Sequence, residues 1–152
     1  MLSKFINKIA PRSPWLYRLN AGSCNGCDVE LATVALIPRY DVERLGCKYC
    51  GSPRHADIVL ISGPLTSRVR DKVLRVYDEI PHPKVTLACG ACPISGGVYR
   101  DSYTVNSPID QYIPIDVVVP GCPPRPHAII EGVALALEIW RKRLEEGTCS
   151  RS

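Results

Sequence analysis

Three segments rich in glycine and proline carry cysteines, and each follows an apolar run of the chain. They are Asn20-Ala-Gly-Ser-Cys-Asn-Gly-Cys-Asp28, Cys89-Gly-Ala-Cys-Pro-Ile-Ser-Gly-Gly97 and Val119-Pro-Gly-Cys-Pro-Pro124. Glycine and proline mark turns, and the turns after parallel strands gather at one edge of an α/β sheet, where ligands bind. We therefore expect Cys24, Cys27, Cys92 and Cys122 to converge at such an edge.

Four converging thiolates are typical of an iron–sulfur cluster or a zinc site. A thiolate ligand needs a backbone that can bend around the metal and donors close to its sulfur. Gly22 and Gly26 permit positive φ beside the first two cysteines, and a helix beginning near Asp28 would add positive dipole potential. Cys89 ends an apolar run, so we interpret it as a buried core residue.

Apolar runs with strand character alternate with segments of helical periodicity. The expected strands are 15–20, 56–62, 84–89 and 113–119, and the expected helices are 28–37, 67–80 and 126–146. Residues 39–50 suggest a turn and a short strand, and residues 98–112 a long loop. This alternation predicts an α/β fold, a flavodoxin-like doubly wound parallel sheet with the cysteines at the carboxyl ends of its strands.

The chain length fits one domain. Of its 152 residues we assign 1–13 to an N-terminal arm, 14–146 to the cluster domain and 147–152 to a loose tail that begins at Gly147, the expected helix stop. The hydrophobic content of 45% indicates a globular protein, and the net charge of +4 selects no partner. No apolar stretch reaches the roughly 18 residues of a membrane span, and no signal peptide is evident, so we expect a cytoplasmic protein.

Disulfide bonds, a flavin site and a zinc site each account for the eight cysteines less well than an iron–sulfur cluster does. Secreted disulfide scaffolds are usually smaller and poorer in core, and a flavin site needs a phosphate cradle where this chain has cysteines. A zinc module is a further alternative, because Cys47 and Cys50 form a second CxxC pair nineteen residues after Cys24–Cys27. That module would leave Cys92 and Cys122 unexplained, so we rank it below the cluster. The roles of Cys47, Cys50 and Cys149 stay open.

Several motifs resemble those of one protein family over roughly residues 13–140. They are the three cysteine segments above, Ser52-Pro-Arg-His-Ala-Asp57, Gly63-Pro-Leu-Thr66 and Pro114-Ile-Asp-Val-Val-Val119. The family is the small electron-transfer subunit shared by NiFe hydrogenases and respiratory complex I (its twenty-kilodalton, PSST-type subunit). The resemblance implies a flavodoxin-like fold and one 4Fe–4S cluster, with Cys24, Cys27, Cys92 and Cys122 as its ligands.

The first ligand segment separates two branches of this family. The complex I version has adjacent cysteines there, whereas two residues separate Cys24 from Cys27 in this chain. This spacing resembles the energy-converting, membrane-bound hydrogenases. The implied partners are a large hydrogenase-like subunit (similar to the forty-nine-kilodalton subunit of complex I), a ferredoxin-type iron–sulfur subunit and membrane subunits, with no nucleic acid. The chain would then lie peripherally on the cytoplasmic face of the membrane.

Our hypothesis is a non-catalytic electron-transfer subunit of an oxidoreductase complex, most simply a hydrogenase that evolves H2. A related ferredoxin-dependent complex that reduces sulfur compounds or quinone is the alternative. Arg54 and His55 are candidates for tuning the cluster, against the simpler interpretation that they lie on a solvated loop. The sequence identifies neither the terminal electron acceptor, the cluster potential nor a pumped ion.

Overall fold

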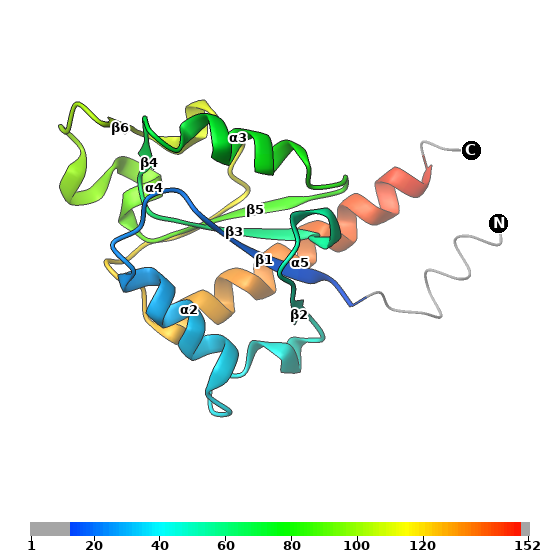
Figure 1. Cartoon of the computed structure of the whole chain (residues 1–152). Helices are drawn as coiled ribbons and strands as arrows, with labels where there is room; N and C mark the ends of the chain where they lie inside the picture. The colour runs from blue at the N-terminus through cyan, green and yellow to red at the C-terminus, as the bar shows by residue number, and fades with distance from the viewer. Residues whose placement is uncertain (1–12, 150–152) are drawn as a thin grey trace.

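A parallel sheet forms the centre of the protein. The structure is a computed structural model that describes residues 13–149, with side chains described for residues 13–146. The strands are β1 (Trp15–Asn20), β2 (Lys48–Tyr49), β3 (Ile58–Ser62), β5 (Val85–Cys89) and β7 (Val117–Val119). Their order is β2-β1-β3-β5-β7, and all neighbouring pairs are parallel (Figure 1). This is the strand order of flavodoxin-like folds, so the expected doubly wound sheet is confirmed.

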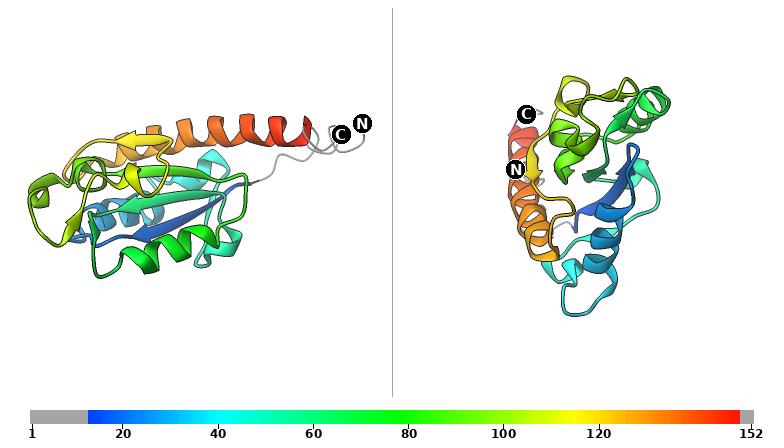
Figure 2. Two further views of the ribbon diagram at one scale, coloured as in Figure 1. Left: turned by 90° about the horizontal axis from the view of Figure 1, so that it is seen from above. Right: turned by 90° about the vertical axis from the view of Figure 1, so that its left-hand side faces the viewer.

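Helices cover both faces of the sheet. They are α2 (Gly26–Leu36), α3 (Arg70–Asp78), the short α4 (Ala91–Ser95) and α5 (Pro126–Cys149). Figure 2 shows α5 and α3 on opposite sides of the strands. Side chains along β3 alternate between these layers: Leu60 packs with α2 and α5, whereas Ile61 packs with α3. The sheet is therefore buried on both faces, as its continuous apolar runs predict.

The segments between the main elements contain more structure than the sequence predicts. A two-stranded antiparallel sheet joins β4 (Leu65–Thr66) to β6 (Val105–Asn106), inside segments expected to be loops. Single 3-10 turns are η1 (Val42–Leu45), η2 (Pro53–His55), η3 (Gly97–Tyr99) and η4 (Ile109–Gln111). The last strand was expected to begin at residue 113, but the backbone N–H of Ile113 donates to the carbonyl oxygen of Ile109 in η4. The strand β7 therefore begins only at Val117.

One expected helix end was right and another was wrong. The helix expected to begin near Asp28 begins at Gly26, with Asn25 at the cap position, and the Asp28 side chain in its first turn points toward the sheet. Gly147 does not end α5, which continues to Cys149; a glycine inside a helix costs only about 1 kcal/mol relative to alanine. Residues 1–12 of the proposed arm and 150–152 of the proposed tail lie outside the described residues.

Membrane-spanning helices are absent from the described part of the chain. None of its helices combines the length and the apolar character that a bilayer crossing requires.

Gly132 provides a test of the packing between α5 and the sheet. A Cβ atom at this position would overlap Val119 Cγ2 and lie 3.3 Å from Leu87 Cδ1. Gly132→Ala should therefore destabilise the fold by about 1–2 kcal/mol, although alanine favours helix, because overpacking outweighs propensity. Thermal unfolding of the purified chain measures the change.

Gly51→Ala is the matched control, because nothing lies within 4 Å of the added atom. Its unfolding temperature should be unchanged or slightly higher. A Gly132→Ala variant as stable as this control would contradict the close packing of α5.

Candidate metal centre

The cysteine segments meet at the carboxyl edge of the sheet. Asn20, Ser62, Cys89 and Val119 are paired across the sheet at the last positions of their strands. The loops after β1, β3, β5 and β7 therefore leave the sheet at one level. Figure 1 shows the starts of α2 and α4 at this edge.

The first segment places its two cysteines differently. Cys24 lies in the loop after β1 and is exposed, whereas Cys27 is the second residue of α2 and is only 7% exposed. Asn25, at the helix cap, adopts a left-handed conformation (φ 70°), and no side chain accepts from the first N–H groups of α2. The positive end of this helix dipole therefore lies beside the two sulfurs.

The other two segments are tied to each other through their backbones. Cys92 lies in α4 and is buried, and Cys122 lies exposed in the loop after β7. The N–H of Gly90 donates to Val119 O (2.9 Å), and the N–H of Ala91 donates to Gly121 O (2.7 Å). Two of the four expected loop cysteines, Cys27 and Cys92, thus lie in first helical turns, where their positions are better fixed than in a loop.

Two of the four thiols, Cys27 and Cys92, have a pKa that is raised in part by the other cysteines of this edge. Burial, followed by repulsion from the thiolates of Cys92, Cys24 and Cys122, raises the pKa of Cys27 to about 11. Burial, then Cys122 and Cys24, also raises the pKa of Cys92. A bound cation would relieve this repulsion, because metal ions favour the thiolate form.

Two glycines leave room for the sulfurs. A Cβ atom at Gly90 would lie 2.6 Å from the Sγ of Cys27, and one at Gly97 would lie 3.1 Å from the Sγ of Cys92. Both glycines also have positive φ, of 95° and 54°. Any other residue would push a sulfur out of place, so the backbone at this edge fits a thiolate-bound group.

Thiolates are the donors of both structural zinc sites and iron–sulfur clusters. Among residues with described side chains, no group of three or more His, Cys, Asp or Glu residues is placed to hold one metal ion. In a cluster of four irons each thiolate binds its own iron, so its ligands need not converge on a single atom. Four cysteine thiols therefore suit a 4Fe–4S cluster by their chemistry.

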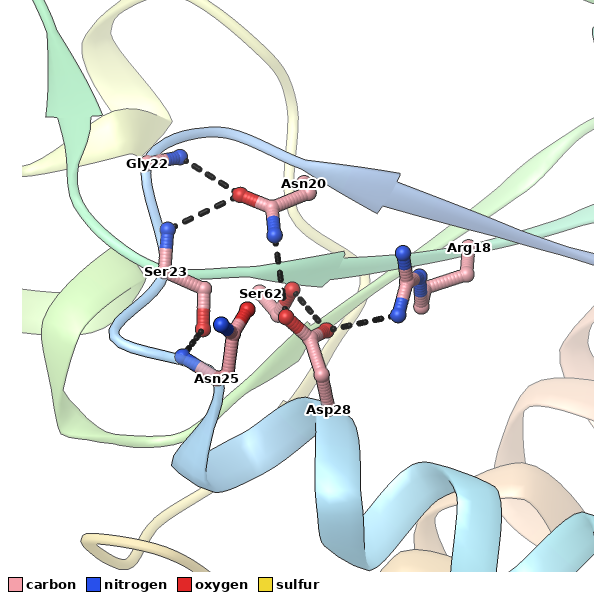
Figure 3. Close-up of polar contacts among 7 residues, drawn as sticks. All are labelled: Arg18, Asn20, Gly22, Ser23, Asn25, Asp28 and Ser62. Carbon is pink, nitrogen blue, oxygen red and sulfur yellow. Dashed lines mark hydrogen bonds and ion pairs between the residues drawn. The ribbon is translucent and has the colours of Figure 1, made fainter.

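A polar network behind the first segment was missed by the sequence analysis. The Oδ1 of Asn20 accepts hydrogen bonds from the N–H groups of Gly22 (2.9 Å) and Ser23 (2.8 Å), and its Nδ2 donates to Asp28 (2.9 Å) (Figure 3). An asparagine that ends a strand before a glycine is a signal for such a turn. The network fixes the loop that carries Cys24.

Cys89 lies against the site without facing solvent. Its side chain is fully buried, as expected. Burial, then the charge and hydrogen bond of Cys27, raise the pKa of Cys89 to about 12. Cys89 is therefore a neutral neighbour of Cys27.

The zinc alternative through Cys24, Cys27, Cys47 and Cys50 is wrong. Cys47 and Cys50 flank β2, which pairs with Trp15 and Leu16 at the start of β1, whereas Cys24 follows the end of that strand. The Sγ of Cys47 donates to Val42 O (3.2 Å), and that of Cys50 to Ser52 O (3.4 Å). Cys47 packs on the α2 and α5 face and Cys50 on the α3 face, which also excludes a redox pair between them. The side chain of Cys149 lies outside the described residues.

Arg54 and His55 lie at the other end of the fold from Cys24, Cys27, Cys92 and Cys122. They belong to η2, which precedes β3, so they are at the opposite end of the strands. Arg54 is 76% exposed and 3.8 Å from Glu79, and the His55 ring lies 6.0 Å from the Trp15 ring. Neither is positioned to tune a group held by the cysteines.

Comparisons with known proteins point to one family. The profile described as "NADH ubiquinone oxidoreductase, 20 Kd subunit" matches residues 24–136. The chain is similar to "Probable membrane-bound hydrogenase subunit mbhJ" of Pyrococcus furiosus, with 54% identity over 144 residues that cover 95% of this chain and 83% of the relative. It is also 42% identical to "Formate hydrogenlyase subunit 7" of Escherichia coli, over 95% of this chain but only 56% of that protein.

A solved structure agrees with these matches. A chain in the structure of the membrane-bound sulfane sulfur reductase, an archaeal respiratory membrane complex, superposes with a TM-score of 0.76 at 36% identity. The match covers 91% of this chain and 76% of that one.

Thiol labelling tests the geometry of this edge in chain prepared without metal. At about pH 8, iodoacetamide should modify Cys24 and Cys122 at least roughly tenfold faster than Cys27, because burial blocks access and the raised pKa keeps Cys27 protonated. Below a pKa of about 11 the thiolate fraction grows with pH, so Cys27 labelling should accelerate about tenfold per pH unit. Peptide mass spectrometry measures each rate, and equal rates for Cys24 and Cys27 would contradict the arrangement.

Proposed function

We propose that this chain, which belongs to the NADH ubiquinone oxidoreductase 20 kDa subunit family, is an electron-transfer subunit that holds one 4Fe–4S cluster. Cys24, Cys27, Cys92 and Cys122 are the proposed ligands. The observation that carries the proposal is that β1, β5 and β7 end at one level of the sheet, so the segments that carry these four cysteines meet at one edge. Members of this family belong to oxidoreductase complexes, and the proposed role here is non-catalytic.

Each part of the edge has a role in this proposal. The bound cluster would supply a one-electron redox centre. Cys27 and Cys92, both buried, fix its inner side, and Gly90 and Gly97 keep the backbone clear of their sulfurs. The exposed Cys24 and Cys122 hold its outer side, so an electron can leave toward a neighbouring subunit.

Exposed apolar side chains that follow the cysteines along the chain support a protein partner. Val29 follows Cys27 in α2 and is 62% exposed, and Val98 and Tyr103, after Cys92, are 85% and 99% exposed. Large exposed apolar groups near a functional edge are typical of interaction sites. We propose that a large hydrogenase-like subunit covers this edge, and that a ferredoxin-type subunit and membrane subunits complete the complex on the cytoplasmic face of the membrane.

The proposed reaction of the whole complex is H2 evolution by a membrane-bound NiFe hydrogenase. The similarity to the Pyrococcus furiosus and Escherichia coli proteins favours it. The similarity to the sulfane sulfur reductase favours a second candidate, electron delivery to a sulfur compound. This chain has the same proposed role in both, because the large subunit determines the acceptor.

Substitution of one proposed ligand tests cluster binding in the purified complex. Cys122→Ser should abolish the reduced-state electron paramagnetic resonance signal of this cluster and lower iron and sulfide by about four atoms each, because a four-iron cluster depends on its thiolate ligands. Cys50→Ser is the matched control, since Cys50 lies at the other end of β1, and it should leave signal and iron unchanged. A normal signal in Cys122→Ser would remove Cys122 from the ligand set.

The terminal acceptor is tested with the same complex. Supplied with reduced ferredoxin, it should evolve H2, and the Cys122→Ser complex should lose at least about nine-tenths of that rate, because tunnelling through the subunit needs its redox centre. Gas chromatography measures the product. Sulfide formation from polysulfide without H2 would replace the first candidate by the second.

A further inference from the structure

A buried carboxylate lies directly beside the proposed ligands and has no role in the function described so far. Asp28 follows Cys27 in the first turn of α2, and its side chain is only 6% exposed. It points at the ends of β1 and β3 instead of into solvent (Figure 3). Burying a charge is costly unless partners compensate it, so such a residue needs an explanation.

Three donors hold the Asp28 carboxylate. The Ser62 hydroxyl donates to Oδ1 (2.7 Å), the Asn20 amide donates to Oδ2 (2.9 Å), and Arg18 Nη1 lies 3.5 Å from Oδ1. An ionised carboxylate only accepts hydrogen bonds, and all three partners can donate. The side chain is therefore accommodated as an anion at a fixed position.

The same network connects this anion to both halves of the CxxC segment. Asn20, which donates to Asp28, also accepts from the backbone of Gly22 and Ser23 just before Cys24. Cys27 is joined to Asp28 through the helix backbone. The carboxylate is thus held relative to the sulfur of Cys27 by covalent bonds and relative to that of Cys24 by hydrogen bonds through Asn20.

The charges around this site are unequally screened. Asp28 is buried, whereas the Arg18 side chain is 50% exposed, so water weakens the field of the cation more than that of the anion. The carboxylate belongs to the residue that directly follows Cys27 in the first turn of α2. The less screened charge of the pair, held next to this proposed ligand, is therefore the negative one.

We propose that Asp28 is a potential-setting residue: its fixed, buried carboxylate beside Cys27 lowers the reduction potential of the group that the four cysteines hold. This inference rests on the proposed function. Reduction adds one electron, and therefore one negative charge, to that group, and a neighbouring anion opposes the addition. Arg18 partly offsets the effect. A low potential makes the reduced subunit a strong electron donor, as delivery of electrons to protons requires.

Opposite shifts in two variants test the proposal in the intact complex. Asp28→Asn, which keeps the size of the side chain, should raise the ratio of reduced to oxidised cluster at a fixed potential by roughly tenfold, equivalent to about 59 mV for a one-electron couple. Arg18→Gln should shift the midpoint potential the other way by a smaller amount. A redox titration followed by electron paramagnetic resonance measures both.

Glu79→Gln is the matched control. Glu79 also pairs with an arginine, Arg54 at 3.8 Å, but this pair is exposed and lies at the opposite end of the strands from the proposed ligands. Its removal should leave the midpoint potential unchanged. A merely structural role of Asp28 would reduce cluster content without moving the potential in opposite directions for Asp28 and Arg18.

The outcomes separate this inference from the proposed function. Absence of a cluster signal in the unaltered complex would overturn the proposed function itself. A normal signal whose potential stays unchanged or falls in Asp28→Asn would overturn only the role of Asp28. If Asp28→Asn fails to assemble, Arg18→Gln decides: a lower potential supports the proposal, and an unchanged or higher potential contradicts it.

Discussion

The parallel register of four strands determines where the functional side chains of this chain lie. Asn20 pairs with Ser62, Ser62 with Cys89, and Cys89 with Val119, so four strands end at one level. Every loop that carries a proposed ligand begins there. A slip of one residue in a strand would turn its side chains to the other face and move its loop along the edge. The apolar layers on both faces fix the register and thereby the geometry of the cysteines.

Metal binding at this edge is linked to proton release. The raised pKa values of Cys27 and Cys92 mean that these thiols remain protonated in the folded chain near neutral pH. A metal group must therefore displace their protons when it binds. Its positive charge compensates the thiolates and the nearby Asp28. Cys27 and Cys89 also belong to the apolar core on one face of the sheet, so the metal site and the core share side chains.

The sequence predicted the sheet well because its strands are buried on both faces. The continuous apolar runs at β3 and β5 and the helical periodicity of α3 and α5 leave few alternatives. The small β4–β6 sheet could not be predicted, since its strands have two residues each and form through a long-range contact.

At the site itself, the positions of some residues could be predicted from the sequence and those of others could not. The flanking glycines and prolines predicted that the cysteine segments would meet, and the register brings them to one edge. The position of Asp28 at a helix start was predictable, but only tertiary structure supplies its partners Asn20 and Ser62. The spacing of Cys47 and Cys50 from Cys24 and Cys27 matches that of zinc sites. The sequence does not show that β2 pairs with the start of β1, which separates the two cysteine pairs in the fold.

If four sulfurs enclose one iron–sulfur cluster, a cryo-electron microscopy map of the intact complex should contain a single compact density at the carboxyl edge of the sheet. The sulfurs of Cys24, Cys27, Cys92 and Cys122 should contact this density, with Asp28 directly behind Cys27. Density of single-ion size, or any of these four sulfurs directed away from it, would show that the chain does not hold such a cluster.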